Sequence, residues 1–199
     1  METNNEFLAR VLKRIGTPTV TSFRFDSWSH AGKPTSEGVG LLPVPGIDAE
    51  KFFARVMDLD HYVGPIPHVV ESRSVADPRC QPGQVHFYQR VKVPLIGDLH
   101  QESVITRLPA QNGFELVAWQ LLDKETEALS PKTAIRAGYS DGVWMVAPGV
   151  VGYALSAAPR RDDVGFIKWK ALTTGADATA SKVIRDNIAA MSRWAGFSV

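Results

Sequence analysis

Cysteine is almost absent from this chain of 199 residues, since Cys80 is the only one. A single thiol excludes an intrachain disulfide and the usual zinc sites built from several cysteines. Lysine and arginine number 22 against 21 acidic residues, which gives a formal net charge of +1. Proteins that bind nucleic acid usually carry a clear basic excess, so we expect no nucleic-acid partner.

Signatures of cofactor and metal chemistry are also scarce. The chain has no His-Glu-x-x-His pair of zinc peptidases and no glycine-rich phosphate loop. The stretch Gly38-Val39-Gly40 is not followed by the third glycine that a dinucleotide fingerprint needs. We therefore expect no cofactor and no metal ion. A minor alternative, a metal site, rests on four residues close in sequence, Asp58, Asp60, His61 and His68.

The sequence shows neither a signal peptide nor a clear membrane-spanning segment. The opening residues, METNNEFLARVLKRIG, lack the basic and then apolar pattern of a signal peptide, so we expect a cytoplasmic location. Gly142 to Pro159 carries no charge and approaches the length of a membrane span. Pro148-Gly149 interrupts it, which favours two strands joined by a turn. We expect no integral span, while transient contact with a membrane stays compatible with the sequence.

What the chain does contain is a long amphipathic segment near its C-terminus. Between Thr174 and Trp194 apolar residues recur in steps of three and four, which predicts one long helix with a single apolar face. These residues are Ala180, Val183, Ile184, Ile188, Met191 and Trp194. Residues 5–15 show the same periodicity and predict a shorter N-terminal helix.

Most of the chain between these helices has the character of β-strands separated by turns. Strands are predicted at 19–28, 39–44, 68–75, 84–93, 99–108, 114–122, 135–147, 150–157 and 164–172, with a short helix after Asp48. Tight turns between successive strands predict an antiparallel meander. Strand 114–122 is apolar on both faces, so its outer side needs a cover, either the N-terminal segment or a partner chain.

Two stretches carry a resemblance to a known family. Asp48 to Val75 reads as a short helix, a loop and a strand, and His86 to Leu108 reads as paired strands around a proline turn. The matching positions of the first stretch are Asp58, Tyr62, Pro67, Val69 and Ser72. Together they resemble the START domain and its superfamily, the SRPBCC or helix-grip fold, which includes polyketide cyclases and the birch-pollen allergen. This implies an α+β fold in which a curved antiparallel sheet wraps around the C-terminal helix, with an N-terminal helix before it.

The resemblance covers residues 39–197 and, more loosely, the N-terminal helix. We therefore expect one domain, 1–199, with residues 1–38 as a helix and strand extension of its core. START proteins often carry Arg-Asp just after the proline turn, whereas this chain has Leu99 and His100 there. If the missing arginine orients a ligand, the residues that could replace it are Arg90, Arg107 and Arg136, and the sequence does not choose among them.

The implied fold leaves an apolar space between sheet and helix, with a few polar groups to orient a ligand. Burying a lipid tail stabilises the complex by about 0.8 kcal/mol per CH2, so such a protein can hold a lipid without carrying out any reaction on it. We expect the chain to bind, and to transport, a lipid or another hydrophobic small molecule. The candidate ligand contacts are Tyr88, Arg90, Glu102, Trp119, Trp144, Tyr153, Asn187 and Met191.

Other interpretations remain open. Tyr88 and Arg90 share a strand face with other polar residues, and such a face is more often the solvent side of a sheet. Trp119 and Trp144 are more often plain core than ligand contacts. The alternative function is an enzyme of the polyketide cyclase or aromatase type, with Glu102 and His100 as a candidate acid/base pair. A third is a regulatory module that senses a ligand. The oligomeric state is not predicted.

Overall fold

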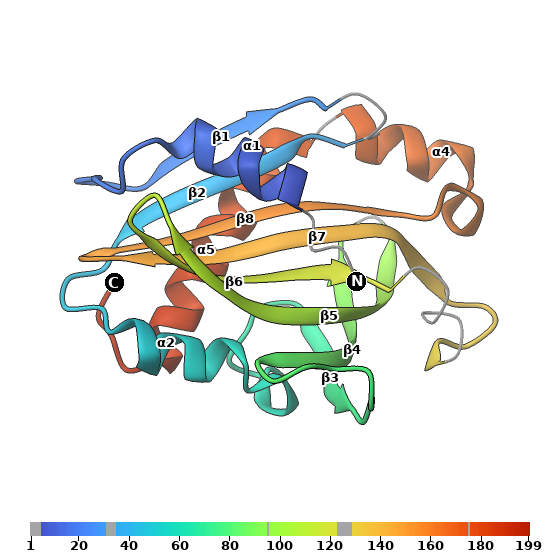
Figure 1. The fold of residues 1–199 in the computed structure, drawn as a ribbon. Helices are drawn as coiled ribbons and strands as arrows, with labels where there is room; N and C mark the ends of the chain where they lie inside the picture. Colours follow the sequence, from blue (N-terminus) through green and yellow to red (C-terminus); the bar gives the residue numbers. More distant parts are fainter. Residues whose placement is uncertain (1–4, 31–34, 95, 123–128, 175) are drawn as a thin grey trace.

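The computed structural model describes residues 5–30, 35–94, 96–122, 129–174 and 176–199 (Figure 1). Eight strands form one sheet. They are β1 (Arg24–Trp28), β2 (Glu37–Pro43), β3 (Val69–Val75), β4 (Gln84–Val93), β5 (Gly97–Gln111), β6 (Phe114–Leu121), β7 (Ile135–Ala147) and β8 (Val150–Pro159). Their order across the sheet is β1-β2-β8-β7-β6-β5-β4-β3.

The sheet confirms the predicted antiparallel meander. Every pair of neighbours in the strand order is antiparallel, and β5 and β7 share a short extra parallel pairing at Leu99 and Ile135. Turn residues make the sharp reversals feasible: Asn112 and Gly113, between β5 and β6, both have positive φ, 52° and 79°. Those angles suit a tight hairpin whose twist matches that of its strands.

Helices lie on both sides of this sheet. They are α1 (Asn5–Ile15), α2 (Ala49–Val56), the 3-10 turn η1 (Leu59–His61), α4 (Arg161–Thr174) and α5 (Ala176–Trp194). Figure 1 shows α1 in front of the sheet and α5 behind it. We call the face toward α5 the inner face and the face toward α1 the outer face.

The outer face is covered where strand β6 runs, as its two apolar faces require. The apolar side of α1 is buried, with Val11 fully enclosed. It shares a cluster with the outer residues Leu116, Val143 and Met145. The N-terminal helix, rather than a partner chain, therefore provides this cover, and its predicted bounds are confirmed.

The inner face and α5 enclose the second cluster. Ile184, Ile188 and Met191 of α5 are almost fully buried there. A Cβ atom added at Gly40 of β2 would lie 2.4 Å from Cγ2 of Ile184, so glycine lets the helix approach the sheet closely. Helix α2, capped by the Asp48 carboxylate that accepts a hydrogen bond from the Lys51 amide at 2.9 Å, adds Phe52 and Phe53 to the same cluster. This is the START helix-grip arrangement.

One predicted element is wrong. Residues 164–172 form part of helix α4 instead of a ninth strand, and the charged stretch at 160–163 leads into that helix. The position beside β8 is already taken, because β8 lies between β2 and β7. Asp162 and Asp163 in the first turn favour a helix start. A kink at Gly165, with φ 71°, hides the helical period in the sequence.

Smaller differences concern element ends and the uncharged segment. The first strand occupies only Arg24–Trp28 of the predicted 19–28. The segment from Gly142 onward forms parts of β7 and β8, as expected. Among the helices of the described residues, none is long and apolar enough to cross a membrane.

Candidate functional site

Alternation along the strands assigns each candidate residue to one face of the sheet. Phe87, Ile105 and Trp119 share the cluster under α5, so they mark the inner face. Their neighbours Tyr88 and Glu102, which pair with each other across β4 and β5, therefore lie on the outer face. The eight candidate residues are consequently divided between two sides of the sheet and do not form one site.

Aromatic rings occupy the centre of the inner face. Trp119 and Tyr153 stack with centroids 5.6 Å apart, and Trp144 lies 4.2 Å from Tyr153. Phe52 of α2 meets Trp144 edge-on at 5.6 Å. The Trp119 ring packs directly over Gly142, which has no side chain. A Cβ atom added at Gly142 would lie 1.9 Å from the ring. Three predicted ligand contacts thus pack together as one aromatic surface.

Helix α5 contributes the remaining two inner candidates. Met191 is fully buried in the cluster. Asn187 interacts with Tyr153, but its Oδ1 atom is buried without a hydrogen-bond partner. Burial raises the pKa of the Tyr153 phenol, and the Asn187 side chain partly offsets that rise. The phenol therefore stays protonated and can act as a hydrogen-bond donor.

Four neutral polar side chains lie together on the inner face, and the sequence analysis did not predict them. Gln101 Nε2 donates to Gln89 Oε1 at 2.9 Å, and Gln89 Nε2 donates to Ser72 Oγ at 3.5 Å. Ser103 lies on the same face of β5, is fully buried, and its Oγ has no hydrogen-bond partner. We call Ser72, Gln89, Gln101 and Ser103 the inner polar group. The signal was present, since Gln89 interrupts the apolar alternation of Phe87 and Val91.

Burial on the inner face is uneven. Around Val117, Trp144 and Val151 the side chains are almost completely enclosed. Toward the other end of the strands, Leu121 and Leu155 keep part of their surface accessible, as does Val183 of α5. This end of the inner face is therefore less completely enclosed.

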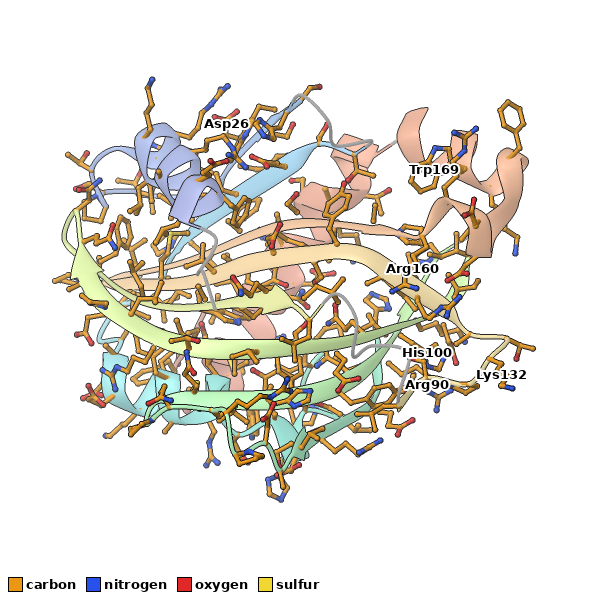
Figure 2. The ribbon with its side chains drawn as sticks, turned by 45° about the vertical axis from the view of Figure 1, so that its right-hand side comes forward. Asp26, Arg90, His100, Lys132, Arg160 and Trp169 are labelled. Atoms are coloured by element: carbon orange, nitrogen blue, oxygen red, sulfur yellow. The ribbon has the colours of Figure 1, made fainter. Side chains whose placement is uncertain are left out.

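The three outer candidates are engaged with polar partners. Arg90 Nη1 donates to Asp98 Oδ2 at 2.6 Å, which raises the pKa of the guanidinium, and its Nε lies 3.3 Å from Glu71. Tyr88 Oη lies 2.6 Å from His100 Nδ1, and burial raises the pKa of the phenol. Figure 2 shows Arg90 and His100 close together at one end of the strand pair β4–β5.

Glu102 belongs to a different cluster on the outer face. Its Oε1 lies 2.7 Å from Nε2 of His86, whose Nδ1 lies 3.1 Å from Oδ2 of Asp77. All three side chains are at least nine-tenths buried. A hydrogen bond from Arg79 holds the pKa of Asp77 well below its ordinary value. Glu102 contacts His86, whereas His100 contacts Tyr88, so each member of the predicted acid/base pair is engaged with a different neighbour.

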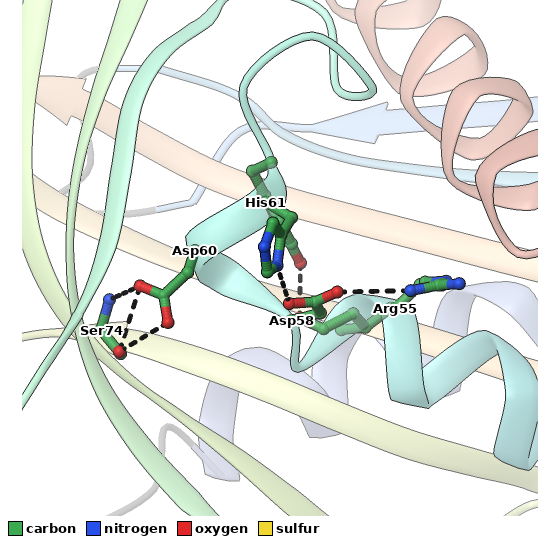
Figure 3. Close-up of polar contacts among 7 residues, drawn as sticks. Arg55, Asp58, Asp60, His61 and Ser74 are labelled. Atoms are coloured by element: carbon green, nitrogen blue, oxygen red, sulfur yellow. Dashed lines mark hydrogen bonds and ion pairs between the residues drawn. The ribbon is translucent and has the colours of Figure 1, made fainter.

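The acidic residues around η1 serve separate partners (Figure 3). Asp58 Oδ1 lies 2.6 Å from Nδ1 of the exposed His61, whose pKa it raises, and Asp58 Oδ2 lies 3.4 Å from Arg55. Asp60 accepts hydrogen bonds from the amide of Ser74 at 2.6 Å and from its hydroxyl, which lower the pKa of Asp60. Within the described ranges no three His, Cys, Asp or Glu side chains are grouped to hold a metal ion.

The stretch Gly138 to Gly142, Gly-Tyr-Ser-Asp-Gly, matches the Gly-x-Ser-x-Gly pattern of serine hydrolases, and the sequence reasoning missed it. In those enzymes the serine sits exposed on a sharp turn between a strand and a helix. Here Ser140 lies inside strand β7, is 1% exposed, and is 3.3 Å from Nε1 of Trp119, which donates to its hydroxyl. The context of a nucleophile is therefore missing.

Comparison of the whole fold gives consistent neighbours. No protein-family model matches this chain, and no curated protein sequence matches it. A STAR-related lipid transfer protein from Xanthomonas axonopodis superposes with a TM-score of 0.68 at 15% identity, over 89% of this chain and 95% of that one. Human STARD10 gives 0.65 at 13%, over 95% and 81% of the two chains. Human StAR-related lipid transfer protein 5 gives 0.65 at 9%, over 96% and 95%. At these identities the likeness establishes the START fold alone.

Proposed function

We propose that this protein binds and carries a lipid or another hydrophobic small molecule between α5 and the inner face of the sheet, without catalysis. The observation that carries the proposal is the inner polar chemistry. Ser103 Oγ and Asn187 Oδ1 are buried in an apolar interior without hydrogen-bond partners. An unpaired buried polar atom costs about 1–3 kcal/mol, so a ligand that supplies the partner recovers that free energy.

The proposed ligand lies against the less enclosed end of the inner face. Leu121, Leu155 and Val183 offer accessible apolar surface there. Trp119, Trp144, Tyr153, Asn187 and Met191 are the predicted contacts that we retain as lining residues. Tyr88, Arg90 and Glu102 lie on the outer face and are left out of the proposed site.

The fold supports this proposal by analogy. The proteins with which the chain superposes include two that are described as lipid transfer proteins. A shared fold at low identity does not carry function, so the argument rests on the inner polar chemistry. We further propose that residues 1–199 act as one domain with a core of 39–197, in a cytoplasmic location, and that ligand exchange involves transient contact with a membrane.

The alternative, a polyketide cyclase or aromatase, has weaker support. Such an enzyme needs an acid and a base within reach of the substrate. The buried polar residues of the described inner face are serines and glutamines, while Glu102 and His100 lie on the opposite side. Tyr62 and Tyr153 are buried titratable groups of the inner cluster, and burial raises the pKa of both phenols, which makes them poor bases at neutral pH.

Organic extraction of the purified protein followed by mass spectrometry tests the proposal directly. We expect a co-purified hydrophobic molecule, or saturable binding of a neutral fluorescent lipid by the extracted protein. A protein that yields no extract and binds no such probe would contradict the proposal.

A matched pair of variants locates the site. Leu121 and Gln120 are adjacent on β6, partly exposed, and lie on opposite faces. We expect Leu121→Trp to fill the interior and weaken binding at least about tenfold, a change of 1.4 kcal/mol. The control Gln120→Trp should bind like the wild type. Equal effects of both variants would place the ligand elsewhere.

A further inference from the structure

We infer that the ligand carries an uncharged polar head, such as a hydroxyl, ester or amide, and not a carboxylate or phosphate. This inference rests on the proposed function, because it specifies the ligand of the same site. It follows from the chemistry of the groups that face the interior and from the partners that hold every candidate arginine.

The polar side chains of the inner polar group are neutral, and they can both donate and accept hydrogen bonds. Ser72, Gln89, Gln101 and Ser103 are each at least nine-tenths buried, and none carries a charge. A serine hydroxyl donates and accepts, and a glutamine amide offers two donors and one acceptor. Ser103 Oγ has no partner of its own. A head with a hydroxyl or carbonyl group can pair with such atoms.

Helix α5, on the other side of the interior, also presents a neutral polar side chain, Asn187. Asn187 lies on α5, and its interaction with Tyr153 shows that it faces the sheet. Its buried Oδ1 lacks a hydrogen-bond partner and accepts hydrogen bonds only. An acceptor in this position suits a ligand hydroxyl or amide hydrogen. It repels a carboxylate, which has no hydrogen to donate.

The three arginines that could anchor a charged head group are all paired with acidic side chains. Arg90 is on the outer face with Asp98 and Glu71. Arg107 contacts Glu50 and Glu115 at the rim near α2.

Arg136, the third arginine that could replace the missing one, is held by both carboxylate oxygens of Asp163. An anionic head buried among the described inner residues would therefore lack a counter-charge. Burying an unpaired ion is strongly unfavourable, whereas a neutral head loses little when its hydrogen bonds are replaced.

The test compares ligands that differ only in the head. Displacement of Nile red from the wild-type protein is titrated with dodecanol, methyl dodecanoate and dodecanoate, each kept below its aggregation concentration at neutral pH. We expect dodecanol or its ester counterpart to displace the dye at a concentration at least about tenfold lower than dodecanoate, which corresponds to one decade in Kd.

A charge variant sharpens the comparison. Gln101→Lys places a cation in the inner polar group, so the preference should move toward dodecanoate. Gln120→Lys introduces the same charge on the outer face and should leave the preference unchanged. Circular dichroism checks the fold of both variants; if Gln101→Lys does not fold, the wild-type titration decides alone.

Each outcome separates the two ideas. Binding of all three ligands without a neutral preference, or with an anionic one, overturns the head-group inference and leaves the proposed function intact. Binding of none of them, together with no binding of Nile red, overturns both. A neutral preference that Gln120→Lys abolishes as strongly as Gln101→Lys also counts against the inner polar group.

Discussion

The two faces of the sheet bury polar residues of different kinds. The buried polar residues of the inner face are neutral: Ser72, Gln89, Gln101, Ser103 and Ser140. Those of the outer face are mostly ionisable: Glu37, His86, His100, Glu102 and Asp141, together with the neutral Ser156. Charged groups survive burial only with partners, as Glu37 with Arg10 illustrates. The two faces therefore differ in charge, and the neutral polar residues of the inner face suit an uncharged ligand.

The largest expected effect concerns the outer face. Glu37 is fully buried and accepts hydrogen bonds from Arg10, at 2.6 and 2.9 Å, and from Trp28. Arg10→Leu leaves a buried carboxylate without its counter-ion and should lower the free energy of unfolding by about 3 kcal/mol. Urea denaturation measures this loss.

The control for this change lies one turn along the same helix. Arg14 pairs with Asp26 at 3.5 Å, and both side chains are well exposed. Arg14→Leu should cost less than about 1 kcal/mol. If the two variants lose equal stability, buried charge does not distinguish the outer face.

The inner aromatic surface should be next in sensitivity. Gly142→Ala forces the Trp119 ring to move, because the new Cβ atom would lie 1.9 Å from it. We expect a loss of about 2 kcal/mol, as for other overpacked cores, and a change in tryptophan fluorescence. In a Trp119→Leu background the same substitution should cost less, so additivity of the two changes would argue against the clash.

The inner polar group should behave in the opposite way to the outer charges. Ser103→Ala removes a buried hydroxyl without a partner. We expect it to raise the free energy of unfolding by about 1 kcal/mol while weakening the binding of a ligand with a hydroxyl head. Calorimetry of the ligand-free and ligand-bound protein measures both. A loss of stability in the ligand-free variant would assign Ser103 a structural role.

The smallest effect is visible only as a pH dependence. Burial lowers the pKa of His100 below its ordinary 6.5, so the folded state binds this proton less tightly than the unfolded state. The stabilising contribution is therefore complete above pH 6.5 and is lost as the pH falls below it. His100→Gln should flatten this decline in unfolding experiments.

His61 supplies the contrast. Asp58 raises its pKa above the ordinary 6.5, so any contribution is present below pH 6.5 and is lost as the pH rises through the folded-state value. His61→Gln should leave the decline on the acid side unchanged. An identical slope for His100→Gln and the wild type would show that His100 does not cause it.

Much of this architecture could be predicted from periodicity alone. The bounds of α1, β4 and β7 are those expected, because each has a clear period and a clear end signal. The wrong prediction at α4 has two physical causes. Gly165 interrupts the helical period, and β8 already has neighbours on both sides, β2 and β7, so a ninth strand cannot pair with it. The local sequence does not reveal which strands lie beside β8.

The candidate site was less accessible from sequence. Alternation separates Tyr88 from Phe87 but does not say which of the two faces α5. That choice depends on α1 covering the other side, a contact between residues far apart in the chain. The pairing of Arg107 with Glu50, also distant in sequence, is equally invisible to a local pattern.

The placement of β2 beside β8 has a consequence for how the chain is made. Pro43 finds its sheet partner, Val150, only after most of the protein has been synthesised. Strands β3 to β8 can join their neighbours as each emerges from the ribosome, whereas β1 and β2 have only each other until β8 appears. Long-range pairing of this kind slows folding and leaves strand edges exposed in the meantime. The free edge of β2 therefore stays unpaired until β8 has been made.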